Sequence, residues 1–212
     1  MLYVVGLQMK SGHRRALIFF TLAAALAAQS QPDSLIGRWR SLEASAAGVS
    51  TVFEFHDDNR LDSYSAVISA EKYRLIGTDT ILLQSREGRE EKQELEWDNP
   101  DRARIEDEAA GKSIELTRLG KSPDSRNPLV GEWSTTQKWH GQDYPARAVF
   151  FADKHVLWII HLRAEHGRYA AENQNIRLEI SNRPVVSGKF AVAGNRLTIA
   201  NPQGGQSTFE RF

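Results

Sequence analysis

The sequence of 212 residues contains no cysteine. Disulfide bridges, thiolate catalysis, zinc–thiolate sites and lipid attachment through a processed N-terminal cysteine are therefore excluded. The chain also lacks an excess of either charge, since 27 basic residues balance 27 acidic ones. This mixed composition does not favour nucleic acid or an anionic membrane surface as a partner.

The short motifs that mark common catalytic and cofactor sites are missing as well. We find no Gly-x-Ser-x-Gly elbow, P-loop, His-Glu-x-x-His pair or dinucleotide-binding glycine pattern. His155 and His161 share a strand face but lie about 20 Å apart at strand rise, so they cannot hold one metal ion together. We therefore expect no cofactor, no metal ion and no enzymatic activity. An enzyme whose site assembles from distant residues is the less favoured alternative.

No apolar run reaches the roughly 20 residues that a membrane-spanning helix needs; Ala16–Ala27 has only twelve. A basic region precedes this run and contains Lys10, His13, Arg14 and Arg15. The run ends in Ala25-Leu26-Ala27, the small-x-small pattern of a signal-peptidase site. We therefore expect residues 1–27 to be a signal peptide, with residues 1–8 a misassigned start ahead of Met9. The mature chain would be exported, periplasmic or extracellular, soluble, and without a membrane span or a Cys-linked lipid anchor.

What the sequence does contain is an internal repeat. Leu35-Ile36-Gly37-Arg38-Trp39 returns 94 residues later as Leu129-Val130-Gly131-Glu132-Trp133. Each copy opens a stretch of about 85 residues that ends in an apolar strand with one arginine, Arg118 or Arg211. We therefore expect two copies of one β-module that pack on each other. The expected boundaries are residues 35–120 and 129–212 for the modules and residues 121–128 for a polar linker with two prolines.

Both modules consist of strand signals separated by turn residues, without helical periodicity between them. In the first module the expected strands are Gly37–Glu43, Thr51–Phe55, Leu61–Ile68, Lys72–Ile76, Thr80–Gln84, Lys92–Trp97, one around Ala103 and Ile105, and Ile114–Arg118. In the second they are Gly131–Trp139, Arg147–Phe151, His155–Leu162, Gly167–Ala171, Asn175–Ile180, Val185–Val192, Arg196–Ile199 and a final one at Phe209–Arg211. Short links predict an antiparallel meander, and about eight strands can close on themselves. The predicted fold is all-β, with two tandem small meander β-barrels.

The last strand of each module places an arginine on a burying face. Ile114, Leu116 and Arg118 share one side-chain phase. A buried guanidinium needs acceptors and a flat surface, and the ring of Trp39 would provide that surface in a closed meander. By the same argument Arg211 would cover Trp133.

Two further features of the second module lead to predictions. The segment His155–Leu162 is apolar on both faces, so we expect it or a neighbouring strand to pack against the first module. The mixed-charge segment that follows, with Arg163, Glu165 and Arg168, is interpreted as a turn. An offset of 96 residues matches Phe151 with Phe55 and Tyr169 with Tyr73.

Gly37-Arg38-Trp39 with Arg118, and Gly131-Glu132-Trp133 with Arg211, resemble the calycin group, which includes lipocalins and bacterial lipocalin-like domains. The resemblance implies an eight-stranded barrel closed at one end by the arginine and the tryptophan. Modules of about 85 residues are shorter than typical lipocalins, which implies room for a small ligand at most. A tandem immunoglobulin-like sandwich is the alternative fold.

Aromatic residues are the best candidates for a binding site, because ligand pockets are mostly apolar with few polar anchors. The candidates are Tyr73, Trp97, Trp139, Trp158 and Tyr169. We expect a non-enzymatic binding protein for a small apolar or amphipathic molecule. The alternative is an envelope structural or interaction module with filled barrels.

Overall fold

The computed structural model describes residues 34–212 except 108–110 and 122–125. The expected signal peptide and part of the expected linker lie outside the described residues. Fourteen strands make up the described part. They are β1 (Gly37–Ala44), β2 (Val49–Phe55), β3 (Arg60–Ile76), β4 (Thr80–Gln84), β5 (Glu90–Asn99), β6 (Arg102–Asp107), β7 (Lys112–Leu119), β8 (Gly131–Trp139), β9 (Gln142–Phe150), β10 (His155–Glu172), β11 (Asn175–Ile180), β12 (Val186–Ala193), β13 (Arg196–Ala200) and β14 (Gln206–Arg211). Within the described residues, no helix has the length and apolar character needed to cross a membrane.

All fourteen strands belong to one antiparallel meander. Each strand pairs with its neighbours in the chain, and β1 pairs with β14 to close the ring. The all-β, antiparallel prediction is therefore confirmed. Side chains alternate between the two sides of a strand: in β2, Phe53 and Phe55 are buried, while Glu54 between them points to the other side and is partly exposed.

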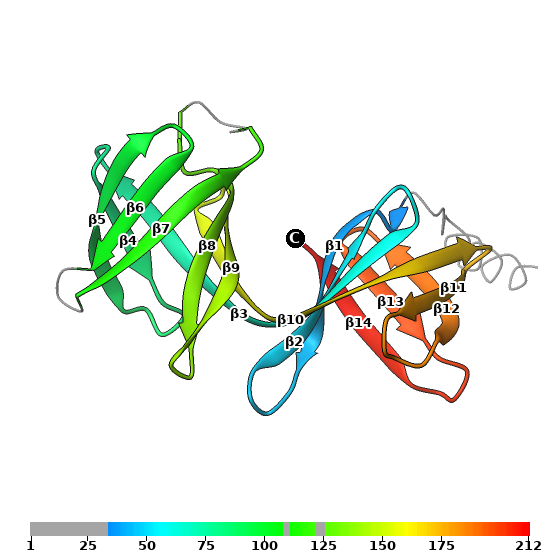
Figure 1. Cartoon of the computed structure of the whole chain (residues 1–212). Coiled ribbons are helices and arrows are strands. Elements are labelled where there is room, and N and C mark those ends of the chain that lie inside the picture. Colours follow the sequence, from blue (N-terminus) through cyan, green and yellow to red (C-terminus); the bar gives the residue numbers. More distant parts are fainter. Residues whose placement is uncertain (1–33, 108–110, 122–125) are drawn as a thin grey trace, which may run out of the picture.

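The two longest strands, β3 with 17 residues and β10 with 18, also pair with each other across the ring. This pairing runs from His155 opposite Lys72 to Arg168 opposite Arg60. It divides the sheet into two lobes, each bounded by eight strands (Figure 1). The middle lobe comprises β3 through β10. The terminal lobe comprises β10 through β14 together with β1, β2 and β3.

The prediction of two separate barrels, one for each repeat, is wrong. The terminal lobe combines β1 and β2 of the first repeat with β11–β14 of the second, and the middle lobe combines β4–β7 of the first with β8 and β9 of the second. The repeats exchange strands because β3 and β10 run straight through positions where turns were expected. The segments 69–71 and 163–168, which carry polar residues, lie inside these strands, where the strands hydrogen-bond to each other, with one bulge between His161 and Arg163.

Each lobe has its own hydrophobic core, and each core draws on both repeats. In the terminal lobe the buried residues are Leu35, Trp39, Phe53, Phe55, Leu61, Tyr169, Ile176, Leu178, Ile180, Phe190, Leu197, Ile199 and Phe209. In the middle lobe they are Tyr73, Ile81, Leu83, Leu95, Ala103, Ile105, Leu116, Leu129, Trp133, Ala148, Phe150, Val156 and Trp158.

A third, smaller cluster lies at the junction of the lobes and explains why β10 is apolar on both faces. Val156 and Trp158 point into the middle-lobe core, whereas Leu157 and Ile159 point the other way. Val52 and Ala66 of the first repeat cover them there. The strand is thus buried on one side by its own lobe and on the other by the junction.

The hairpins β2–β3 and β9–β10 are structural twins, offset by 95 residues. Their turns place Asn59 and Lys154 at φ values of 63° and 70°. Gly37 pairs with Phe55 in the first repeat, and Gly131 pairs with Phe150 in the second. Phe55 therefore corresponds to Phe150, and the expected match with Phe151 is wrong by one residue.

Candidate functional site

Each lobe is sealed at one end by an arginine that lies on a tryptophan. In the terminal lobe the Arg211 guanidinium carbon is 4.3 Å from the centre of the Trp39 ring. Arg211 also donates to the carbonyls of Ile36, at 2.7 Å, and Ser34, while the Trp39 indole donates to the Leu35 carbonyl at 2.7 Å. Burial, acceptors and a π face together hold this charge inside the protein.

The middle lobe repeats this arrangement. Arg118 lies 4.0 Å from the centre of the Trp133 ring and donates to Val130, Pro128 and Pro100 carbonyls. Burial lowers the pKa of this guanidinium, an effect that the nearby Asp101 carboxylate opposes. The predicted partners were Trp39 for Arg118 and Trp133 for Arg211. Those assignments are wrong, because the strand exchange brings each arginine to the tryptophan of the other repeat.

The glycine of each Gly-x-Trp motif serves this closure. Gly37 and Gly131 have φ values of 119° and 126°, which side chains of L-residues rarely allow. A Cβ on Gly37 would also lie 3.0 Å from Nη1 of Arg211. The motif therefore needs glycine for its backbone conformation and for the close approach of the arginine.

The five aromatic candidates do not surround one cavity. Tyr169 belongs to the terminal-lobe core, and Tyr73 belongs to the middle-lobe core. Their hydroxyls donate to the carbonyls of His56 and Phe151, which ties each hairpin turn to the opposite repeat.

The three tryptophan candidates are also spread over the molecule. Trp97 packs on Trp133, and its indole donates to the Thr78 carbonyl at 3.0 Å. Trp139, at the end of β8, contacts His140. Trp158 lines the middle-lobe cavity described below, and its indole donates to Glu71 at 2.9 Å.

The terminal lobe contains a cavity of about 480 Å³ at the end opposite its Arg–Trp closure. Its apolar wall consists of Ala44, Val49, Phe53, Leu178, Ile180, Pro184, Val186, Ile199 and Phe209. Hydroxyl-bearing and charged residues line the rest, namely Ser41, Glu43, Ser45, Thr51, Arg183 and Ser207. The volume and this mixture of surfaces fall within the range typical of small-molecule sites.

A buried carboxylate anchors one side of that cavity. The Glu165 side chain is only 5% exposed and pairs with Arg183, which lines the cavity, and with Arg163 at 2.9 Å. The rim of the cavity carries charges of both signs, since Glu43 lines it together with Arg183. Arg183 and the hydroxyl groups of the rim can donate to a ligand whose polar end accepts hydrogen bonds.

Other hollows in the described part of the chain have different walls. The interior of the middle lobe holds about 270 Å³ next to Trp158. A larger depression of about 950 Å³ runs along the outside of β10–β13, and one of about 870 Å³ lies beside β3 and the β4–β5 turn. The two larger hollows are lined mainly by exposed polar residues, such as Lys189 and Arg86, although the core residues Tyr169 and Ile176 also line the one along β10–β13.

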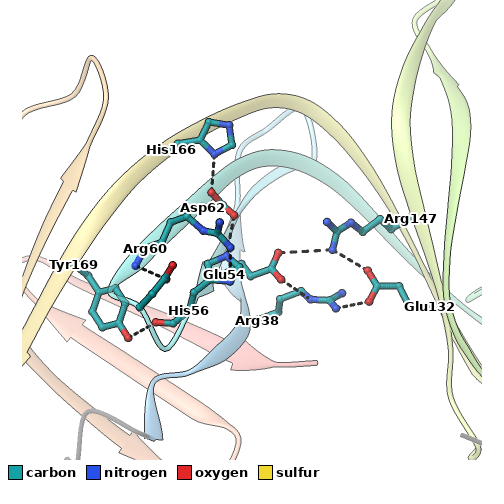
Figure 2. Close-up of polar contacts among 10 residues, drawn as sticks. Arg38, Glu54, His56, Arg60, Asp62, Glu132, Arg147, His166 and Tyr169 are labelled. Atoms are coloured by element: carbon teal, nitrogen blue, oxygen red, sulfur yellow. Dashed lines mark hydrogen bonds and ion pairs between the residues drawn. The ribbon is translucent and has the colours of Figure 1, made fainter. Parts of the chain in front are cut away.

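Polar residues gather at the junction between the lobes (Figure 2). Arg38 and Arg147 alternate with Glu54 and Glu132 in a ring of ion pairs. Glu132 holds both arginines closely, with Arg147 at 2.8 Å, whereas Glu54 lies 3.5 Å from Arg38 and 3.7 Å from Arg147. The ring is balanced in charge, and Glu54 is its loosely held member.

Beside this ring, Asp62 accepts hydrogen bonds from two histidines. His56 Nε2 lies 2.9 Å from Oδ2, and His166 Nδ1 lies 2.6 Å from Oδ1. Burial opposes ionisation of Asp62, but these hydrogen bonds outweigh it and hold the pKa of the carboxyl below its ordinary value. Arg60 donates to His56 Nδ1 at 3.1 Å, so the proton of the neutral ring lies on Nε2.

His161 stacks on Tyr64 at the same junction, with 4.5 Å between ring centres. Burial, and then the charges of Arg147 and Arg38, lower the pKa of His161 to about 4 against the opposing effect of Glu132. The pKa of Tyr64 is raised, first by burial and then by Asp62 and Glu54. His161 is therefore a neutral ring at ordinary pH.

Sequence reasoning missed the cluster of His56, Asp62 and His166. His56 and Asp62 flank one hairpin turn, and a register that pairs Phe55 with Leu61 makes them diagonal neighbours on one face of the hairpin. His166 belongs to the other repeat, so only knowledge of the strand exchange could have added it. Comparison of the chain with protein-family models, with curated proteins and with solved structures finds no match.

Proposed function

We propose that this protein is an exported, non-enzymatic binding protein that takes a small apolar or amphipathic molecule into the terminal-lobe cavity. The observation that carries the proposal is the cavity of about 480 Å³, with a wall of core residues and a polar rim. The two Gly-x-Trp motifs with their arginines support a resemblance to calycins, in which a closed end lies opposite an open one.

The polar rim suggests which end of the ligand faces outward. Ser41, Ser45, Thr51 and Ser207 offer hydroxyl groups, and Arg183 offers a cationic donor. Phe53 and Phe209 form the floor, with 5.1 Å between their ring centres. We therefore expect the apolar body of the ligand to contact these rings and its polar end to meet the rim.

The alternative function, a structural or interaction module with filled lobes, is supported by the middle lobe. Its interior space of about 270 Å³ is smaller than usual ligand pockets. In our proposal the middle lobe therefore serves as the rigid support, and the terminal lobe binds.

Two measurements test this proposal. Native mass spectrometry of the protein from its own host should reveal a bound small molecule. Titration with a dansylated fatty acid should give one saturable site, and Thr51→Trp, which fills the cavity from β2, should weaken binding more than tenfold. Thr208→Trp changes the same residue type on a strand of the same lobe without lining the cavity, and it should bind like the parent. A bare mass with no probe uptake, or equal binding by both variants, would contradict the proposal.

A further inference from the structure

Three metal-ligating side chains of the β2–β3 hairpin point to one place at the lobe junction. One oxygen each of Glu54 and Asp62 and one ring nitrogen of His56 lie within 4.8 Å of one another. Glu54 and Asp62 are register partners, and His56 follows Glu54 by two residues on the same face. Their side chains are 18%, 12% and 22% exposed, so all three donors are largely withdrawn from water.

The second repeat provides an internal comparison for this site. In the twin hairpin β9–β10, Val149, Phe151 and Leu157 occupy the positions of Glu54, His56 and Asp62. His166, which pairs opposite Asp62, has Ala70 as its twin, opposite Leu157. All four positions of the twin are therefore apolar.

The twin shows that the fold does not require polar residues here. Both turns have the same backbone hydrogen bond, from His56 to Arg60 at 3.0 Å and from Phe151 to His155 at 2.8 Å. Val149 and Phe151 pack on the third hydrophobic cluster. Partly burying two carboxylates and an imidazole costs desolvation energy that the apolar set avoids. A ligand that uses these donors would account for their presence.

We propose that Glu54, His56 and Asp62 form a binding site for a divalent transition-metal ion of the zinc type, with His166 positioning Asp62. One imidazole nitrogen and two carboxylates suit zinc, and three protein ligands leave a position open for water. His166 donates to Oδ1 of Asp62 and so turns Oδ2 toward His56, as an outer-shell partner does in metal sites. Glu54 can turn to the ion because Glu132 already holds both arginines of the ring.

Arg60 competes with metal binding at this site. Its donation to Nδ1 keeps the ring proton on Nε2, the nitrogen that would bind the ion. Metal binding transfers that proton to Nδ1, so the neutral ring releases no net proton and Arg60 must leave. Arg60 is exposed, so its displacement is not hindered by packing.

The test is isothermal titration of the untagged mature protein with ZnCl₂. We expect one ion per chain, with His56→Gln and Asp62→Asn each weakening binding at least tenfold. Arg60→Gln should strengthen it several-fold, because a glutamine oxygen accepts from Nδ1–H where arginine cannot. His155→Gln is the matched control. It removes an imidazole that pairs with Asp153 at 3.2 Å on the twin turn, and it should leave the affinity unchanged.

A further variant, with residues taken from the twin hairpin, tests whether a loss of zinc binding could result from misfolding. The variant Glu54→Val/His56→Phe/Asp62→Leu copies a hairpin that already folds in this chain, and it should melt cooperatively but bind no zinc. Absence of a stoichiometric site in the parent would overturn the proposal. So would retention of that site in both His56→Gln and Asp62→Asn, or weaker binding by Arg60→Gln.

Discussion

The strand exchange predicts which arginine is energetically coupled to which tryptophan. In the structure Arg211 lies on Trp39, although the two residues are at opposite ends of the described chain. Two repeats that closed separately would instead place Arg118 on Trp39. Double-mutant cycles on Arg211→Met with Trp39→Leu, and on Arg118→Met with Trp39→Leu, distinguish the two arrangements.

The structure sets the expected magnitudes. Arg211→Met keeps an aliphatic stem over the ring but loses the charged hydrogen bonds to Ile36 and Ser34 and the cation–π contact. Charged bonds of this kind contribute about 1.5 kcal/mol each, so we expect a loss of about 3 kcal/mol. Trp39→Leu leaves a cavity in a fully buried position and should also cost about 3 kcal/mol.

The prediction concerns the coupling energy between the two residues of each cycle and not the loss of stability in each single variant. For Arg211 and Trp39 we expect a coupling energy of about 1 to 2 kcal/mol, between the values for exposed and for desolvated cation–π contacts. For Arg118 and Trp39 we expect additivity within about 0.5 kcal/mol, because Arg118 contacts Trp133 instead. Urea denaturation followed by tryptophan fluorescence and circular dichroism measures both cycles. Coupling in the Arg118–Trp39 cycle and none in the Arg211–Trp39 cycle would refute the exchange.

Two further predictions concern the junction and the linker. In the folded protein burial, and then Arg147 and Arg38, lower the pKa of His161 to about 4, against about 6.5 in the unfolded chain. Between these two pH values the unfolded chain therefore binds more protons than the folded one. The free energy of unfolding should fall by about 2 kcal/mol as the pH drops from 6.5 to 4, after allowance for the partial exposure of His161. His161→Gln should remove most of this slope in pH-dependent urea titrations, and an unchanged slope would exclude His161 as its cause. Cleavage at a protease site inserted within residues 121–126 should leave the halves associated, because β1–β14, β3–β10 and β7–β8 all pair one half with the other. The melting temperature of the cut protein should then depend on concentration, whereas fragments that separate on gel filtration would contradict the exchange.

Much of the fold could be predicted from local patterns. Alternating apolar residues and turn chemistry located the strands, and the recurrence of Gly-x-Trp with a terminal arginine identified both closures. These signals are local, or depend on the similarity of the two halves. Such signals predict that a terminal arginine packs on a Gly-x-Trp tryptophan. Because the two repeats offer equivalent partners, the signals do not determine which repeat supplies the tryptophan for each arginine.

Whether the two repeats fold separately or exchange strands depends on two short segments. Ser69–Glu71 interrupts the apolar pattern of β3, and Arg163–Arg168 interrupts that of β10. Polar interruptions usually indicate a turn, and a turn at either place would fold the strand back into its own repeat. Here the two interruptions lie in paired strands, at or next to the junction, where side chains can reach water. The information needed was thus a contact between distant segments, which no local pattern contains.

The candidate sites, like the fold, depend partly on local patterns and partly on contacts between distant segments. Tyr169, Tyr73 and Trp158 belong to the two lobe cores, because an in-phase aromatic on a strand serves packing as well as binding. The terminal-lobe cavity depends on Phe53 from one repeat and Leu178 from the other, which no single module would bring together. The cluster at Asp62 likewise needs His166 across the β3–β10 pairing.

One difference between the repeats lies where the repeats meet. The middle residue of Gly-x-Trp is Arg38 in one copy and Glu132 in the other, and these equivalent residues form an ion pair with each other across the junction. Two copies of the first half, joined in the same way, would set arginine against arginine, and two copies of the second would set glutamate against glutamate. Like charges at such a partly buried contact disfavour self-pairing of either half. The opposite charges therefore favour pairing between unlike halves over pairing between two copies of one half.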